Sequence, residues 1–161
     1  MTEQQKKPQV EDEIHAILDG ERKETALQFA AWLRENQLTP QPWFRPGWWR
    51  IPFGEYYLCA MIVANANWNV FFFKGDYSGV HDEKFVKAVT DCVFPCTKCH
   101  GEGWTQCKGI PATIFGKEFT DTCFQFPIQF DNPCVEALEH VKKLIEYWKE
   151  AATRSDSWHC R

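Results

Sequence analysis

The sequence predicts an α+β fold in which helices cover one face of an antiparallel sheet, and the sheet is made of a meander plus a hairpin. Apolar residues recur at helical spacing near both ends of the chain and at every second position between them. The resulting order of helix, meander, helix, hairpin and helix is typical of the α+β class. With 44% hydrophobic residues, the 161 residues suffice for a single domain over residues 1–161 with one core.

Two helices are expected before the sheet. Residues 1–10 are polar and are assigned to a flexible tail, whereas residues 12–19 have the apolar spacing of a short helix. From Glu21 onwards, leucine, phenylalanine and alanine recur at helical spacing as far as Asn36. Two prolines follow soon afterwards and prevent the second helix from continuing.

The meander is expected to contain three strands, at residues 48–53, 56–64 and 68–73. Turns are expected at Gly54 and at residues 65–67. The middle strand is apolar on both of its faces, as in a strand in the interior of a sheet. The predicted helices are too few to cover both faces, so one face of the sheet is expected to lack a cover.

A helix from Asp82 to Cys92 and a hairpin are expected next. The hairpin strands are predicted at residues 112–115 and 122–130, around a turn at Gly116. Because the second of these strands contains a proline, it is expected at the edge of a sheet.

The terminal helix has the clearest sequence signals. Asn132 is expected to cap it, and Pro133 is expected at its first helical position. Residues 153–161 are assigned to a second tail. The predicted apolar stripe of the helix is Val135, Leu138, Val141, Ile145 and Trp148.

Charge and hydropathy exclude two classes of partner. The net charge of −4 and the pI of about 5.7 argue against binding to a nucleic-acid backbone. The start of the chain lacks the apolar run of a secretory signal, and the longest apolar stretch, residues 56–64, is too short to span a membrane. We therefore expect a cytoplasmic protein with neither nucleic acid nor membrane as partner.

Five of the eight cysteines lie within residues 92–123, which we assign to a cysteine-rich, metal-binding insert. In a reducing compartment, clustered cysteines are metal ligands or redox groups more often than disulfides. For the fourth position of a tetrahedral zinc site, Cys123 is favoured over Cys92. Four thiolates close such a site, so the predicted zinc is structural. The candidate ligands are Cys96, Cys99, Cys107, Cys123 and Cys92.

Residues 96–103 (CTKCHGEG) resemble the C-x-x-C-x-G-x-G zinc half-site of J-domain chaperones. That family pairs two such half-sites, whereas this chain retains only a C-x-G fragment at Cys107. The resemblance covers eight residues and implies zinc-ligand geometry at Cys96 and Cys99, without a chaperone function. His100 is a further candidate ligand.

Two redox interpretations use the same cysteines. Cys92, Cys96 and Cys99 have the spacing of the radical S-adenosylmethionine cluster motif, but the chain is too short for that family's barrel. A thioredoxin-like pair at Cys96 and Cys99 lacks the βαβ context of that fold. The alternative function for these cysteines is nevertheless a thiol-dependent redox enzyme. A third interpretation is that the cysteines are simply free or buried.

Aromatic residues make up 16% of the chain and include eight tryptophans. Alternation along residues 48–53 puts Trp48 and Arg50 on one face of the sheet and Trp49 on the other. We expect Trp43, Trp48 and Trp68 to line a pocket over the uncovered face, with Arg45 and Arg50 holding an anionic group or stacking on the rings. The simpler interpretation is that the tryptophans fill the core.

The order of GWWRI at 47–51, the cysteine loop, IFGKEF at 114–119 and Asn132-Pro133 resembles that of small uncharacterised bacterial proteins, over about residues 24–150. That resemblance implies no particular activity. The sequence therefore predicts a zinc-stabilised binding module for a small aromatic or amphipathic ligand or for a protein partner.

Overall fold

The structure is a computed structural model that describes residues 7–96 and 109–154. Its helices are α1 (Val10–Ile17), α2 (Gly20–Glu35), α3 (Glu83–Thr90) and α4 (Val135–Arg154). Its strands are β1 (Gln41–Pro42), β2 (Trp48–Phe53), β3 (Tyr56–Ala64), β4 (Asn67–Phe72), β5 (Ile110–Ile114), β6 (Lys117–Thr122) and β7 (Ile128–Asp131). An antiparallel sheet has the order β1-β2-β3-β4-β7, and β5 pairs with β6. The predicted α+β class is confirmed.

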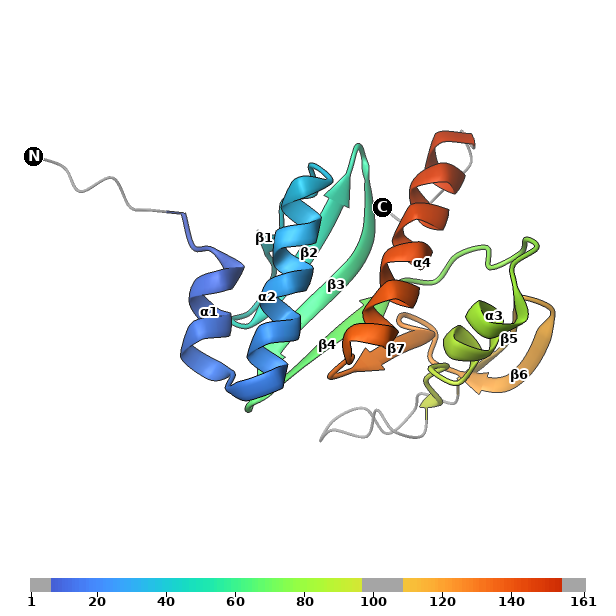
Figure 1. Ribbon diagram of the computed structural model, residues 1–161. Helices are drawn as coiled ribbons and strands as arrows, with labels where there is room; N and C mark the ends of the chain where they lie inside the picture. Colours follow the sequence, from blue (N-terminus) through green and yellow to red (C-terminus); the bar gives the residue numbers. More distant parts are fainter. Residues whose placement is uncertain (1–6, 97–108, 155–161) are drawn as a thin grey trace, which may run out of the picture.

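Helices α1, α2 and α4 lie over one face of the five-stranded sheet (Figure 1). The main core lies between them and the sheet, and it buries Ile14 from α1, Phe29 from α2 and Leu144 from α4. Trp49 enters the same core from β2 and is 2% exposed. Burying side chains of this size stabilises the layer by about 1.5–3 kcal/mol each.

The meander follows the prediction except at one turn. Strands β2 and β3 have the expected bounds, and β3 lies in the interior of the sheet. The turn between β3 and β4 contains two residues rather than three, Asn65 and Ala66, both with positive φ. Such two-residue turns set the register of a hairpin. Strand β4 therefore begins at Asn67, which pairs with Ala64.

The predicted hairpin is wrong in its second strand. The turn lies at Phe115 and Gly116, both with positive φ, and β5 pairs with β6 directly on either side of it. The chain then leaves the hairpin, and β7 pairs with β4 at the edge of the five-stranded sheet. The range 122–130, predicted as one strand, therefore includes the end of β6 in one sheet and most of β7 in the other, and residues 123–127 lie in neither strand.

The segment after α3 connects these two sheets. Val93 pairs with Ile128 of β7, and Pro95 pairs with Thr122 of β6. Between them, the Phe94 carbonyl accepts a hydrogen bond from the Cys123 amide at 2.9 Å. The range 92–123, predicted as one cysteine-rich insert, thus contributes to regular pairing at both of its ends.

The ends of the helical layer also differ from the predictions. Val10, assigned to the N-terminal tail, begins α1 and is fully buried, and α4 extends to Arg154. Asn132 does not cap α4, because its side-chain oxygen accepts a hydrogen bond from the Trp68 amide at 3.0 Å. Val135, placed in the buried stripe of α4, is 54% exposed.

Candidate functional site

The face of the sheet opposite the helices carries a second apolar cluster. Ala60, Ile62 and Phe71 are buried at its centre. The sheet itself separates this cluster from the main core. Partly buried apolar side chains pack around the centre. Within residues 7–96 and 109–154, these side chains rather than a helix shield this face, which we call the uncovered face. They are Trp43, Trp48, Ala64, Phe73 and Phe126.

The loop between β1 and β2 holds several of these aromatic residues in place. The Trp43 amide donates to the Trp48 carbonyl at 2.8 Å, and the Val63 amide donates to the Gly47 carbonyl at 2.8 Å. Gly47 has a φ of +79°, and a Cβ there would lie 2.5 Å from the Val63 oxygen. Only glycine fits this position without a shift of the backbone. The loop is therefore constrained before any ligand binds.

Glu13 of α1 fixes the same loop from the helix side. One carboxylate oxygen accepts the indole N–H of Trp49 at 2.5 Å, and the other accepts the Gly47 amide at 3.3 Å. The carboxylate thus joins the helical layer to the start of β2. Hydrogen bonds to an ionised acceptor are among the stronger ones in proteins.

Aromatic rings and an arginine are stacked at the rim of the uncovered face. The Trp48 ring lies parallel to Phe71, with centroids 6.3 Å apart and an interplanar angle of 12°. The Arg45 guanidinium lies 4.8 Å from the centroids of both Phe44 and Trp48. Phe44 is 60% exposed, so one ring of this stack faces solvent.

Arg50 lies on the same face as Trp48, two residues further along β2. A β-bulge between Ile51 and Pro52 shifts the pairing with β3, so that Tyr57 turns towards this face. The Arg50 guanidinium then lies 4.6 Å from the Tyr57 ring centroid. Its Nε atom is buried and has no hydrogen-bond partner among the described residues.

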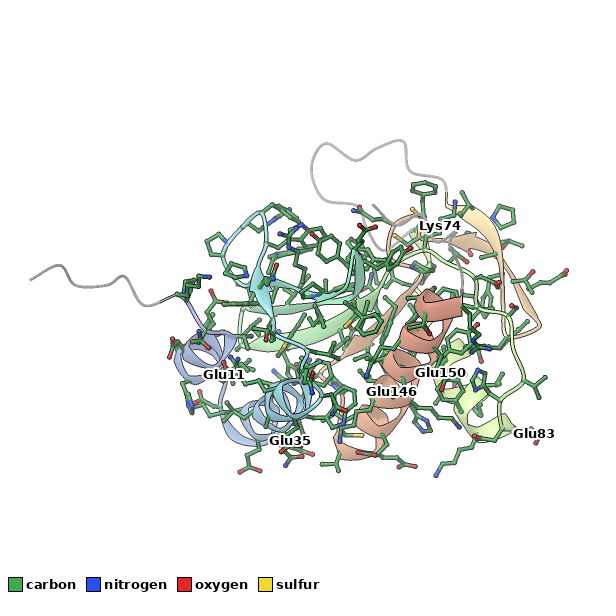
Figure 2. The ribbon with its side chains drawn as sticks, turned by 90° about the horizontal axis from the view of Figure 1, so that it is seen from above. Glu11, Glu35, Lys74, Glu83, Glu146 and Glu150 are labelled. Atoms are coloured by element: carbon green, nitrogen blue, oxygen red, sulfur yellow. The ribbon has the colours of Figure 1, made fainter. Side chains whose placement is uncertain are left out.

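Charge is unevenly distributed between the two sides of the sheet. The segment from residue 41 to residue 74 contains Arg45, Arg50 and Lys74 but a single carboxylate, Glu55. The helices carry 11 of the 19 acidic residues in the described part of the chain. In Figure 2 the labelled glutamates lie with the helices, and Lys74 lies on the opposite side of the sheet. The uncovered face is thus locally basic in an acidic protein.

Trp68 does not belong to the uncovered face, and its prediction as a partly exposed ligand contact is wrong. It is fully buried in the main core, 5.9 Å from Phe29 of α2. The two-residue turn pairs Trp68 with Val63 and places Asn69 on the uncovered face instead. A one-residue change of register moves every side chain of a strand to the other face.

Two predicted zinc ligands lie near each other. Cys96 and Cys123 are 1% and 6% exposed. Each is one residue away from the isolated β-bridge between Pro95 and Thr122. The Cys123 sulfur accepts a hydrogen bond from the Phe126 amide at 3.4 Å. Backbone N–H groups directed at sulfur favour the thiolate that zinc requires.

The remaining predicted ligands fall into two groups. Cys99 and Cys107 lie outside the described residues. The carbonyl of Cys92 accepts a hydrogen bond from the Gln129 amide, at the other end of the connecting segment from Cys96. Burial, followed by the charges of Asp91 and Asp131, raises the pKa of Cys92 to about 11. Among the described residues, no three metal-ligating side chains gather at one place.

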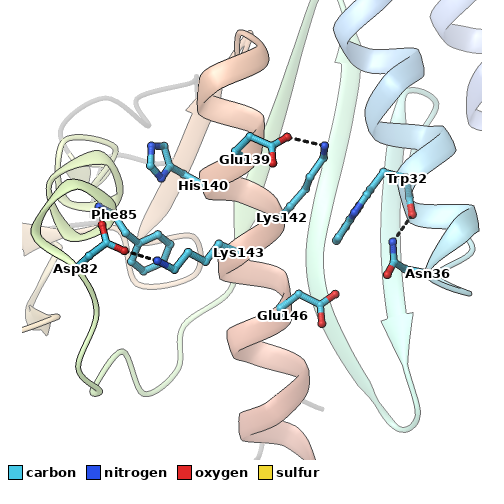
Figure 3. A pocket seen from close by; sticks show the side chains of 9 residues that line it. All are labelled: Trp32, Asn36, Asp82, Phe85, Glu139, His140, Lys142, Lys143 and Glu146. Carbon is cyan, nitrogen blue, oxygen red and sulfur yellow. Dashed lines mark hydrogen bonds and ion pairs between the residues drawn. The ribbon is translucent and has the colours of Figure 1, made fainter.

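The helix side has a pocket of its own. It has a volume of about 550 Å³ and lies beside α4, towards α2 on one side and α3 on the other (Figure 3). Both of its lysines pair with carboxylates of the same lining, Lys143 with Asp82 and Lys142 with Glu139. Lys143 and the Phe85 amide lower the pKa of Asp82 to about 2. The lining residues are Trp32, Asn36, Asp82, Phe85, Glu139, His140, Lys142, Lys143 and Glu146.

The sequence reasoning missed several aromatic residues of the uncovered face. Phe71 and Phe73 alternate with the rest of β4, so the correct register would have assigned them to it. Tyr57 depends on the bulge, and Phe126 reaches the cluster from the irregular segment between β6 and β7. No simple periodicity predicts these last two residues.

Comparison with protein-family models, curated proteins and solved structures finds no match for this chain. The resemblance of residues 96–103 to a zinc half-site, like the resemblance to bacterial proteins, stays a prediction. None of the helices in the described part of the chain has the length and apolar character needed to cross a bilayer.

Proposed function

We propose that the chain is a binding module whose ligand, an aromatic or amphipathic small molecule, occupies the uncovered face of the sheet. The observation that carries this proposal is the second apolar cluster, with Trp43 and Trp48 partly exposed over a buried centre. Contiguous apolar surface of this kind is characteristic of interaction sites. The internally paired charges of the pocket beside α4 make it the weaker candidate.

A structural zinc ion is the second part of the proposal. Cys96 and Cys123 would supply two thiolates, and Cys99 and Cys107 are the proposed remaining ligands. The burial of the two described thiols and the hydrogen bond to Cys123 support this choice. Cys92 is a poorer fourth ligand than Cys123, since its surroundings disfavour the thiolate. Zinc held there would tie the ends of the cysteine loop together and contribute to folding.

The same thiols bear on the compartment and on the alternative function. Four of the described cysteines, Cys59, Cys92, Cys123 and Cys134, have free thiols, which supports the proposed cytoplasmic location. A thiol-dependent redox enzyme needs a cysteine with a lowered pKa. Burial instead raises the pKa of Cys59 and of Cys92, so neither is a nucleophile at neutral pH. This alternative therefore depends on Cys96 and its neighbours in the cysteine loop.

Binding is tested with 2-naphthoate, a flat amphipathic probe, by isothermal titration calorimetry. Trp48→Ala should weaken binding at least tenfold, because it removes a ring from the uncovered face. Trp32→Ala is the matched control, since Trp32 is also partly exposed but lines the pocket beside α4. Loss of binding in Trp32→Ala with retention in Trp48→Ala, or no binding by the wild type, would overturn the proposed site.

Metal content is tested separately. The chain purified under reducing conditions should contain about one zinc ion. Cys96→Ser should release the zinc and lower the unfolding temperature, whereas Cys134→Ser, which changes an exposed thiol, should do neither. A zinc-free wild type, or equal zinc content in the two variants, would contradict the metal site and leave the ligand site standing.

A further inference from the structure

Arg50 differs from the basic residues of the helices. Every lysine and arginine on α2, α3 and α4 except Arg22 forms an ion pair with a carboxylate. Within the described residues, no such pair includes Arg45 or Arg50, whose guanidinium groups lie on aromatic rings instead. The two arginines of the uncovered face therefore keep their capacity to bind an anion.

The buried Nε atom of Arg50 strengthens this contrast. A buried N–H without an acceptor costs free energy that a suitably placed acceptor restores. The guanidinium is planar and carries further N–H donors on its two terminal nitrogens, which suit a carboxylate or phosphate. Tyr57 holds this group in place from one side. Arg50 thus lacks a hydrogen-bond acceptor, and an oxyanion would supply one.

Trp48 supplies the neighbouring apolar surface. It lies two residues from Arg50 on the same face of β2, which is roughly 7 Å at the usual rise per residue along a strand. A fused aromatic ring with an acidic substituent spans this distance. Asp131 is the carboxylate in the paired rows of this face, but β3 and β4 lie between its strand and β2, which places it three strand spacings away, roughly 14 Å.

Charge also argues against two other occupants. A second copy of the chain, placed face to face by twofold symmetry, would bring the arginines of the two copies together. A long polyanion would extend beyond the basic patch onto a protein of net charge −4. A small molecule with a single acidic group encounters neither penalty.

We propose that the uncovered face binds a flat aromatic molecule bearing one oxyanion, with its ring against Trp48 and its oxyanion at Arg50. This inference rests on the proposed function and specifies its ligand class. The ring replaces water over the partly exposed indole, and the oxyanion accepts hydrogen bonds from the Arg50 guanidinium. Arg45, which contacts the rings of both Phe44 and Trp48, adds a second positive charge at the rim.

The test compares three probes by isothermal titration calorimetry: 2-naphthoate, 2-naphthyl phosphate and the neutral 2-naphthylmethanol. The wild type should bind at least one anion tenfold or more tightly than the neutral probe, and the tighter anion identifies the acid group. Arg50→Gln should abolish this preference. Arg154→Gln, which removes a charge from the end of α4, should preserve it.

Arg50→Lys keeps the charge but removes the planar pair of donors, and it provides a second variant if Arg50→Gln does not fold. Its preference for the anions should fall at least threefold. Equal binding of the three probes, or an undiminished preference in both Arg50 variants, would overturn this inference. Binding that depends on Trp48 but not on probe charge would leave the proposed function intact. A wild-type dimer that Trp48→Ala dissociates would assign the face to a second copy instead.

Discussion

The two faces of the five-stranded sheet use the same residue type for different purposes. Trp48 and Trp49 are adjacent in the sequence, yet Trp49 is almost fully buried beneath the helices, and Trp48 is partly exposed in an aromatic cluster. The basic residues of the helices other than Arg22 are paired with carboxylates, whereas on the uncovered face Arg45 and Arg50 lie on rings. The role of each tryptophan therefore depends on whether helices cover its face of the sheet. The number of tryptophans in the chain does not predict that role.

The largest expected effect separates these two tryptophans. Trp49→Ala should lower the free energy of unfolding by about 3–5 kcal/mol, because it leaves a cavity under the helices. It also removes the hydrogen bond to Glu13. Trp48→Ala should cost only about 1–2 kcal/mol, since its ring is partly solvated before truncation. Urea unfolding followed by circular dichroism measures both values, and similar costs for the two variants would contradict the difference between the faces.

The second prediction concerns the stability of the loop that carries Trp43 and Phe44. Gly47→Ala should destabilise the chain by about 2–3 kcal/mol, because a Cβ meets the Val63 oxygen and φ is positive. The matched control is Gly54→Ala, also at positive φ but with no atom near the added Cβ, where about 1 kcal/mol is expected. Thermal and urea unfolding of both variants measure the difference. Equal costs would show that the close approach at Gly47 has no energetic consequence.

The smallest effect concerns pH. The rings of Phe85, Phe115 and Tyr147 surround His81 on the helix side. Burial, and then the Lys143 charge, lower the pKa of His81 against the opposing charges of Asp82 and Glu150. The unfolded chain therefore takes up this proton first, near pH 6.5, and stability falls as the pH drops below that value. The loss should be less than about 1 kcal/mol, since water screens a partly exposed imidazole.

Unfolding in urea between pH 7.5 and pH 5.5 measures this loss. His81→Gln should reduce the pH dependence, and His15→Gln, at an exposed position of α1, should not. Binding of 2-naphthoate should stay constant over the same range, because arginine remains charged throughout. A pH dependence that survives in His81→Gln would assign it to another group.

Much of the fold was predictable because local signals agreed with tertiary packing. The bounds of β2 and β3 followed from alternation, and the apolar stripe located α4. The strand partners of residues 122–130 were not predictable, since both β6 and β7 alternate but belong to different sheets. Asn132 had the residue type of a helix cap, yet it binds the start of β4 through contacts distant in sequence.

The candidate site was predictable in part for the same reason. Alternation within β2 correctly placed Trp48 and Arg50 on one face and Trp49 on the other. The prediction for Trp68 was wrong because the turn between β3 and β4 contains two residues rather than the expected three. The bulge that turns Tyr57 towards Arg50 is a pairing irregularity, and nothing in the alternation of β3 indicates it.

The most direct test is a ¹H–¹⁵N spectrum of the tryptophan indole groups, recorded during titration with 2-naphthoate and assigned by single Trp→Phe variants. The account predicts that the indole signals of Trp43 and Trp48 shift with a common dissociation constant. The signals of Trp49 and Trp68, beneath the helices, should stay in place. Shifts at Trp32 of the pocket beside α4, with Trp48 unchanged, would contradict the assignment of the ligand site to the uncovered face.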